Sequence, residues 1–270
     1  RRQVGDRGGE ATTLNNLGGV HSDLGDKRKA LDFFEQALPL LRQVGDRGGE
    51  ATTLNNIGGV HFDLGDKRKA LDFYEQALPL RRQVGDRGGE ATTLNNLGGV
   101  YDDLGDKRKA LDFYEQALPL RRQVGDRGGE ATTLNNIGRV HDALGDKRKA
   151  LDFYEQALPL LRQVGDRGGE ATTLNNIGAV YDALGDKRKA LDFYEQALPL
   201  LRQVGDRWGE SITRYNMAMV YEDMGDLARA EEELKIVVAL DAAIEHPDLA
   251  SDRAALERVR AKRAGLKAAK

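Results

Sequence analysis

The sequence predicts an all-α solenoid, in which helix pairs stack one after another along the chain. Three observations predict this fold. The run RQVGDRGGEATTLNN recurs at a spacing of 40 residues, apolar residues within each copy recur at helical spacing, and no segment alternates apolar and polar residues as a β-strand does. Residues 1–240 are therefore expected to form six tandem helix-turn-helix repeats, five nearly identical and the sixth, from Arg202, degraded.

Two helices are expected in every repeat, at about residues 7–24 and 27–44 in the register of the first. A Gly-Asp pair precedes each helix, as at Gly25-Asp26. Since glycine can end a helix in the left-handed conformation and aspartate can cap the next, these pairs predict the turns. The predicted apolar stripes are Ala11, Leu14, Leu17, Gly18, His21 and Leu24 on the first helix, and Ala30, Phe34, Ala37, Leu38, Leu41 and Val44 on the second.

Glycine and proline inside these segments oppose helix formation. Gly8-Gly9 and Gly18-Gly19 lie in the first helix, where each interior glycine costs roughly 1 kcal/mol relative to alanine. Pro39 removes a hydrogen bond from the second helix and should bend it. The repeats are therefore expected to hold together through packing on their neighbours rather than through intrinsic helicity.

The residues at these spacings resemble the signature of the tetratricopeptide repeat, and the resemblance covers residues 1–240. It rests on Leu14, Leu17-Gly18, His21 (Tyr101 in the third copy), Gly25, Ala30, Phe34 and Ala37. A 40-residue repeat with long helices is similar to the arrays of kinesin light chains, Pins-type spindle adaptors and multidomain bacterial signalling proteins. The resemblance implies a right-handed α-α superhelix in which Gly18 lets the two helices of a repeat approach closely. Two residues depart from the family pattern. Leu14 occupies a position where the family usually has a large aromatic residue, and Pro39 lies earlier in the repeat than the family's proline.

A second stripe on the first helix is small and polar. In the family this face lines a concave groove that holds extended peptides or partner helices. The residues of this stripe differ among the copies more than the core residues do. Selection for binding a partner and random drift at exposed positions explain this variation equally well. The stripe comprises Thr12, Asn15, Asn16, Gly19, Ser22 and Asp23.

One asparagine of this stripe recurs once per repeat and forms a predicted Asn ladder: Asn16, Asn56, Asn96, Asn136, Asn176 and Asn216. A carboxamide offers a donor and an acceptor together, so it can pair with the backbone of an extended peptide. The resemblance supports this role, because similar arrays use an asparagine at the matching place. The alternative is that each asparagine bonds within its own helix or to the adjacent repeat. The preceding Asn55, Asn95 and Asn135 complete the amide part of the candidate site.

Charged residues along the rim of this groove indicate a protein or peptide partner with some basic character. Asp102, Asp142 and Asp182 are rim acids, Arg139 is a basic interruption and Phe62 an apolar knob. The alternative is that the acids serve solubility. Lys-Arg-Lys triplets open the second helices and are expected on a solvated convex face. A net charge of −3 gives no general attraction to nucleic acid.

No sequence motif indicates catalysis, a cofactor or a metal. The chain has no Cys, and it lacks a Ser-His-Asp order, an HExxH run and a Walker A run. His21, His61 and His141 occur once per repeat, too far apart to share a metal, and His246 stands alone beside Pro247. We therefore expect a non-enzyme. No apolar run approaches 18 residues and no apolar segment opens the chain, so we expect no membrane association and a cytoplasmic protein.

The two ends of the array are expected to differ. Residues 241–270 leave the repeat pattern, and a narrow apolar stripe from Leu249 to Leu266 predicts a C-terminal capping helix. Arg1 falls within what should be the end of a second helix, so helix 7–24 should expose an apolar flank and stack head to tail on another molecule.

These features predict a scaffold that binds an extended peptide or a partner helix in its groove. Two alternatives stay open. The array could be a sensory or regulatory arm of a larger bacterial signalling protein, or it could be a consensus-like array without an evolved ligand. The near identity of the internal copies fits the last reading, whereas the irregular sixth copy fits it poorly.

Overall fold

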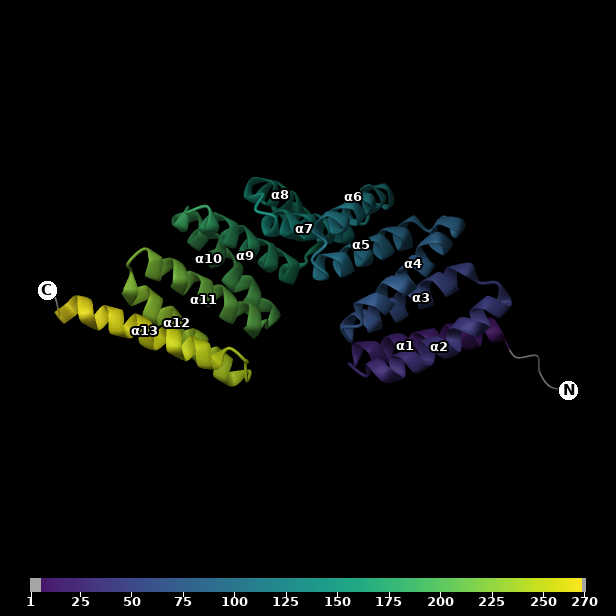
Figure 1. The fold of residues 1–270 in the computed structure, drawn as a ribbon, viewed down its shortest axis with the longest axis horizontal. Coiled ribbons are helices and arrows are strands. Elements are labelled where there is room, and N and C mark those ends of the chain that lie inside the picture. The colour runs from purple at the N-terminus through teal and green to yellow at the C-terminus, as the bar shows by residue number, and fades with distance from the viewer. Residues whose placement is uncertain (1–5, 269–270) are drawn as a thin grey trace. The chain divides into compact units, whose positions relative to one another are not determined.

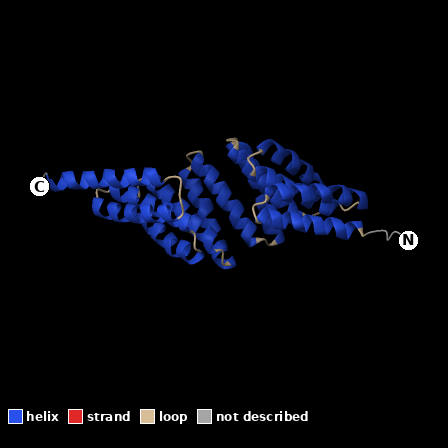
Figure 2. Cartoon of the chain, turned by 90° about the horizontal axis from the view of Figure 1, so that it is seen from below, coloured by secondary structure: helices blue, strands red, loops and turns tan. Residues whose placement is uncertain are grey.

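The structure, a computed structural model, describes residues 6–268 of the chain, and within them all regular structure is helical (Figure 2). The described helices are α1 to α13 (Figure 1). They form two compact units, residues 1–140 and 141–270, in which helix pairs follow one another along the chain. The fold is therefore an all-α solenoid of helix pairs. Within residues 6–268 no helix combines the length and the apolar character that a bilayer crossing requires.

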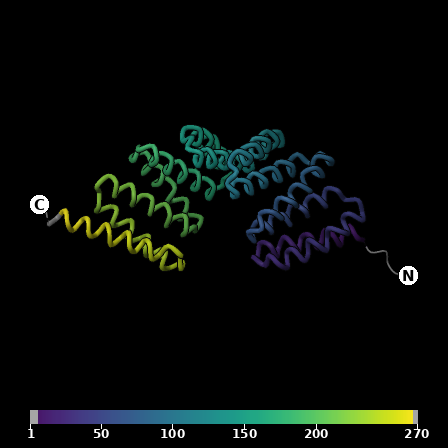
Figure 3. Tube along the Cα trace, viewed as in Figure 1, coloured from purple at the N-terminus to yellow at the C-terminus, as the bar shows by residue number. Residues whose placement is uncertain are grey.

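In the N-terminal unit the first helix of each pair has 17 residues and the second has 18. The helices of a pair pack on each other, and the second helix of one pair packs on the first helix of the next, so that the chain runs from each helix directly to its neighbour (Figure 3). The helices are α1 (Arg7–Asp23), α2 (Lys27–Val44), α3 (Arg47–Asp63), α4 (Lys67–Val84), α5 (Arg87–Asp103) and α6 (Lys107–Val124).

The C-terminal unit repeats this pattern and ends in a long helix, α13. Ala255, Leu256 and Val259 of α13 are buried in one apolar cluster with residues of α10, α11 and α12. This helix therefore packs on the last pair. The helices are α8 (Lys147–Val164), α9 (Arg167–Ala183), α10 (Lys187–Val204), α11 (Arg207–Asp223), α12 (Leu227–Ala243) and α13 (Leu249–Ala268), while α7 (Arg127–Ala143) contains the boundary between the units.

The Gly-Asp pairs form the turns, as the sequence predicts. Gly25 has a φ of 81°, and its N–H bonds to the carbonyl of Ser22. The carboxylate of Asp26 then accepts the backbone N–H of Lys29 at the start of α2. Glycine tolerates this left-handed conformation and aspartate satisfies an end donor, so each turn is fixed by two adjacent residues. Five of the second helices contain a proline and continue through it, as α2 does through Pro39.

Two glycines of the first helix are explained by close contacts. A Cβ on Gly9 would lie 2.5 Å from the carboxylate of Asp6, which caps that helix. A Cβ on Gly58 would lie 2.7 Å from the ring of Tyr74 in the partner helix. In the sixth copy the corresponding positions carry Ala218 and Leu234, both buried, so a larger residue on one helix meets a smaller one on the other.

The predicted apolar stripes are too long by one residue. Leu24 is 74% exposed and Val44 is 46% exposed. Leu24 follows the last residue of α1, and Val44 immediately precedes the left-handed Gly45, so both side chains leave the packed face. Position 20 takes the place of position 24 in the core, since Val60 is 2% exposed. In α1 itself Leu17 and Val20 are 40% and 54% exposed, which leaves an apolar flank uncovered.

A buried glutamate ties each pair to the one before it. Glu50 of α3 is 4% exposed and accepts hydrogen bonds from Arg42 Nε at 2.7 Å and Arg47 at 2.8 Å. Burial by itself raises the pKa of Glu50, but the hydrogen bonds from the two guanidinium groups outweigh it, and the pKa lies below its ordinary value. The arrangement recurs at Glu90, Glu130 and Glu170.

Candidate functional site

The small polar faces of α1, α3 and α5 line two neighbouring hollows in the N-terminal unit. The first, of about 370 Å³, is bordered by Gly19 and Asp23 of α1. The second, of about 240 Å³, is bordered by Arg139 of α7. Phe62, Tyr74 and Asn96 line both hollows, so Phe62 stands between them. We call this pair of hollows the groove.

The two asparagines of each LNN run have different roles. Asn55 Oδ1 accepts a hydrogen bond from Thr93 Oγ1 at 3.1 Å and another from Asn96 Nδ2 at 3.3 Å, both in the next repeat. Asn95 accepts the equivalent bonds from Thr133 at 3.3 Å and Asn136 at 3.2 Å. The first asparagine of the run therefore joins adjacent repeats through its side-chain oxygen.

The second asparagine keeps hydrogen-bonding capacity at the groove. The Nδ2 groups of Asn96 and Asn136 each have two N–H bonds, and each of these groups donates to one asparagine of the preceding repeat. Their Oδ1 atoms accept no hydrogen bond from the described residues. Asn56 lines the first hollow. In these two side chains Nδ2 bonds to the preceding repeat, as the inter-repeat interpretation predicts. Oδ1 stays available to a ligand, as the binding interpretation requires.

The remaining ladder residues lie in different surroundings. Asn16 is exposed on α1, where no repeat precedes it within residues 6–268. Asn176 and Asn216 are half-buried in the C-terminal unit. There Asn216 does not bond to Asn175, whose Oδ1 is buried without a hydrogen-bond partner. Asn135 is half-buried on α7.

The predicted rim acids are largely paired with cations of the chain itself. Asp102 is only 2% exposed and forms ion pairs with Lys107 and with Arg139, the latter at 2.5 Å. Asp142 pairs with Lys147 at 2.6 Å, and Asp182 with Lys187 at 2.7 Å. Asp102 is therefore a buried acid and not an exposed one, because two cations neutralise its charge.

The first lysine of each Lys-Arg-Lys triplet is paired with an acid of a first helix and is not a free, solvated cation. Lys27 of α2 reaches Asp63 of the next pair, and Lys187 pairs with Asp223 at 2.7 Å. The hydrogen bonds from Asp182 and Asp223 raise the pKa of Lys187. Since these lysines bridge neighbouring first helices, they reduce the negative charge that the rim offers to a partner.

The floor of the second hollow carries a buried hydroxyl. Tyr114 lines this hollow, and its buried Oη lies near the Arg139 guanidinium without a hydrogen bond of normal geometry. Asn96, Asn136 and Arg139 border the same space. Amide, guanidinium and phenol groups therefore converge on one small volume, an arrangement suited to hydrogen-bonding a polar chain such as a peptide backbone.

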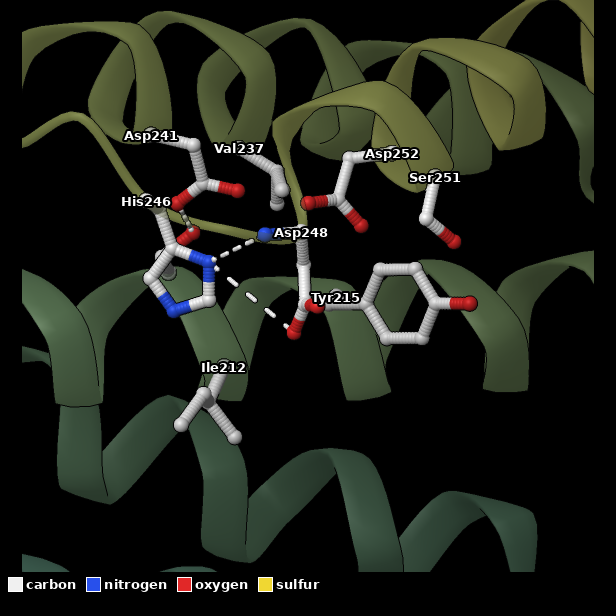
Figure 4. Close-up of a pocket in the computed structure, with 9 residues that line it drawn as sticks. Ile212, Tyr215, Val237, Asp241, His246, Asp248, Ser251 and Asp252 are labelled. Carbon is white, nitrogen blue, oxygen red and sulfur yellow. Dashed lines mark hydrogen bonds and ion pairs between the residues drawn. The ribbon is translucent and has the colours of Figure 1, made fainter.

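Sequence reasoning missed one polar cluster. The sequence places His246 alone, but Asp241 at the end of α12 and Asp252 in the first turns of α13 lie beside it (Figure 4). The three residues occur in the segment that leaves the repeat pattern, so neither the period nor a fixed motif spacing relates them. Only the turn between α12 and α13 brings them together.

Comparison with known families gives one result over most of the chain. The tetratricopeptide repeat profile matches residues 1–43, 49–123, 118–163 and 159–203, and a second profile of the same description matches residues 213–244. No family with a catalytic activity is among these matches. Among curated proteins no sequence matches the chain.

Solved structures with similar folds come from proteins of several kinds. A signal transduction ATPase with numerous domains and a tetratricopeptide repeat sensor, from Pyrococcus horikoshii, aligns with a TM-score of 0.82 at 16% identity over 92% of this chain and 38% of its own. A Rap protein complexed with competence and sporulation factor aligns with a TM-score of 0.67 at 18% identity, over 95% of this chain and 76% of its own. Nearly identical repeats of a putative kinesin light chain from Podospora anserina align with a TM-score of 0.58 at 13% identity, over 72% of this chain and 95% of their own. At these identities the likeness concerns the fold.

Proposed function

Because the chain belongs to the tetratricopeptide repeat family, we propose that it is a protein-interaction scaffold that holds an extended peptide in the groove of its N-terminal unit. A repeat array of this kind presents one surface many times over, which suits it to long and simple ligands. The proposed role is binding and not catalysis.

The observation that carries this proposal is the set of unused polar groups around the groove. The Oδ1 atoms of Asn96 and Asn136 accept no hydrogen bond from the described residues. The buried Oη of Tyr114 lies near the Arg139 guanidinium but makes no hydrogen bond of normal geometry. Buried or half-buried polar groups without partners cost free energy, so a ligand that pairs with them gains affinity. A peptide backbone supplies an N–H for each amide oxygen and a carbonyl for each remaining amide N–H.

The charges of the groove favour one orientation of the peptide. Asp23 is exposed at the first hollow and forms no ion pair with the described residues, whereas Arg139 at the second hollow is already paired with Asp102. We therefore expect the basic part of the peptide to lie over the first hollow. Phe62, between the hollows, offers an apolar contact for one side chain of the peptide.

A peptide-library screen tests the proposal, followed by affinity measurement with the peptides it selects. Changing Asn96 and Asn136 together to Ala should weaken binding by about 30-fold, because each of the two lost hydrogen bonds contributes roughly 1 kcal/mol. Gln43→Ala is the matched control, since Gln43 is an exposed amide of α2 outside both hollows. Unchanged affinity in the Asn96→Ala, Asn136→Ala chain with intact helicity would contradict the ladder. A screen without binders would favour an array lacking an evolved ligand.

A second candidate function is a sensory arm within a larger protein. The similarity to the sensor-bearing ATPase favours it, since this chain matches 38% of that protein. The full-length gene separates the two functions: an adjoining catalytic domain would favour a sensory arm. The cytoplasmic location belongs to the same proposal and is tested by fractionation of cells that produce the chain.

Self-association through α1 stays a prediction. The flank formed by Leu17 and Val20 is exposed, and a second copy is one partner that could cover it. Light scattering at rising concentration tests this: head-to-tail stacking gives a mass that grows with concentration, and a constant monomer mass contradicts it.

A further inference from the structure

A cavity of about 280 Å³ lies in the C-terminal unit between α11 and the turn that joins α12 to α13 (Figure 4). Its walls combine apolar and acidic side chains. Asp241, His246 and Asp252 line one part, and Ile212, Tyr215 and Val237 line the rest.

Two carboxylates face each other in this cavity with no cation between them. Asp241 is 1% exposed and Asp252 is 5% exposed. Asp241 accepts the hydroxyl hydrogen bond of Ser211. Asp252 forms no ion pair with a lysine or arginine of the described residues, and its polar neighbour is Asp241. Two like charges in a buried site are unfavourable unless a cation joins them.

The imidazole of His246 completes the cluster. Its side chain is 8% exposed, and the edge of the Trp208 ring packs against it. Nδ1 accepts the backbone N–H of Asp248 at 3.1 Å, while Nε2 is buried without a hydrogen-bond partner. One nitrogen of this ring and one oxygen from each of Asp241 and Asp252 all lie within 4.8 Å of one another.

We propose that Asp241, His246 and Asp252 bind one divalent transition-metal ion of the zinc class. Two carboxylates and one M²⁺ ion make a neutral group, which removes the charge repulsion inside the cavity. A ligand set that includes imidazole suits Zn²⁺ better than Mg²⁺ or Ca²⁺, which prefer oxygen ligands alone. Zinc bonds of about 2.0–2.2 Å place tetrahedral ligand atoms roughly 3.3–3.5 Å apart, so the three side chains must close in by small rotations. The cavity leaves room for water at the fourth position.

The ion would join α12, the turn and α13. Asp241 belongs to α12, His246 to the turn, and Asp252 to α13, so a shared ion links three segments of the cap. Since the site exists only in the folded chain, binding should raise the thermal stability of this unit. The ion would take Nδ1, the ring nitrogen on the side of Asp241 and Asp252 (Figure 4), and would replace the Asp248 N–H at that nitrogen.

Calorimetric titration of the chelator-treated chain with Zn²⁺ tests this proposal, with Co²⁺ absorption as a report on the ligand geometry. We expect one ion per chain with micromolar or tighter affinity, retained in excess Mg²⁺. Asp252→Asn and His246→Gln should each weaken Zn²⁺ binding by at least about tenfold. His21→Gln is the matched control, since it removes a histidine from another part of the chain and should leave the affinity unchanged.

Folding of the variants is checked by circular dichroism. Asp252→Asn keeps the shape of the side chain and removes a like charge from beside Asp241, so it should retain its helix content and lose the Zn²⁺-induced rise in melting temperature. No saturable Zn²⁺ binding by the unaltered chain at millimolar metal would overturn the proposal. Unchanged affinity in the folded Asp252→Asn, His246→Gln double variant would overturn it as well.

Discussion

Asn96 donates a hydrogen bond of 3.3 Å from its side-chain nitrogen to the side-chain oxygen of Asn55, which lies 41 residues earlier in the chain. The same oxygen also accepts the hydroxyl of Thr93, which is fully buried. The Thr93 hydroxyl has a second acceptor in the Gly89 carbonyl at 3.0 Å. Asn55 therefore joins two side chains of the next repeat, while Asn96 is a donor that also lines the groove.

Asn55→Ala should lower the free energy of unfolding by about 1–2 kcal/mol, because it removes the shared acceptor of two contacts between repeats and leaves an Asn96 N–H without its partner, while the Thr93 hydroxyl keeps the Gly89 carbonyl. Asn96→Ala removes one donor and should cost about 1 kcal/mol or less. Urea unfolding followed by circular dichroism measures both. Equal losses of unfolding free energy in the two variants would contradict the idea that Asn55 serves mainly stability and Asn96 mainly the groove.

Gly58→Ala should destabilise the chain by about 1–3 kcal/mol, since the new methyl group would press on the ring of Tyr74. Changing Tyr74 to Leu in the same chain should recover part of this loss, because Ala218 and Leu234 already pack in that combination. A double-mutant cycle measures the coupling, and additive effects would contradict the size match. Gly19→Ala is the control: a Cβ on Gly19 would have no atom within 4 Å, so this change should stabilise the helix by about 0.5–1 kcal/mol.

Acid should destabilise the array through its buried glutamates. Burial raises the pKa of Glu50, Glu90 and Glu170. Each of these glutamates also accepts hydrogen bonds from two arginines, which lower its pKa by more than burial raises it, so the pKa lies below the ordinary value. A lowered pKa in the folded state means that the stabilisation is complete above the ordinary glutamate pKa of about 4.3 and is lost as the pH falls through the folded-state value.

The urea midpoint, measured from neutral pH to about pH 3, checks this expectation. Changing all three glutamates to Gln should lower stability at neutral pH and flatten its decline in acid. Glu75→Gln, at an exposed position of α4, should leave the decline unchanged. An equally steep decline in the triple variant would show that other groups cause it.

The fold was predictable because one signal is repeated. Each Gly-Asp pair marks a turn by a local mechanism, and apolar residues such as Ala30 and Phe34 return at helical spacing in every copy. The error at Leu24 has a local cause as well. Periodicity alone does not show that the helix ends at Asp23, and beyond that end the stripe no longer faces the core.

The candidate site was less predictable because its contacts cross between repeats. Spacing places Asn55 and Asn96 on polar faces, but their pairing depends on the register of one helix against the next. For the same reason the sequence pattern places Lys27 on a solvated face, although its long side chain reaches Asp63 of the following pair. The cluster at Asp241 arises from a turn that occurs once, so no repetition reveals it.

Salt should weaken peptide binding chiefly through Asp23. This carboxylate is exposed at the first hollow, whereas its counterpart Asp63 is already paired with Lys27. Asp23→Asn should therefore weaken binding of a basic peptide by about two- to fivefold at low salt, the size expected of an exposed ion pair, and by less at high salt, where such a pair is screened. Asp32→Asn, at an exposed position of α2 outside the groove, should change neither the affinity nor its salt dependence. Fluorescence anisotropy across a salt series makes the comparison, and equal salt dependence in all three chains would remove Asp23 from the binding site.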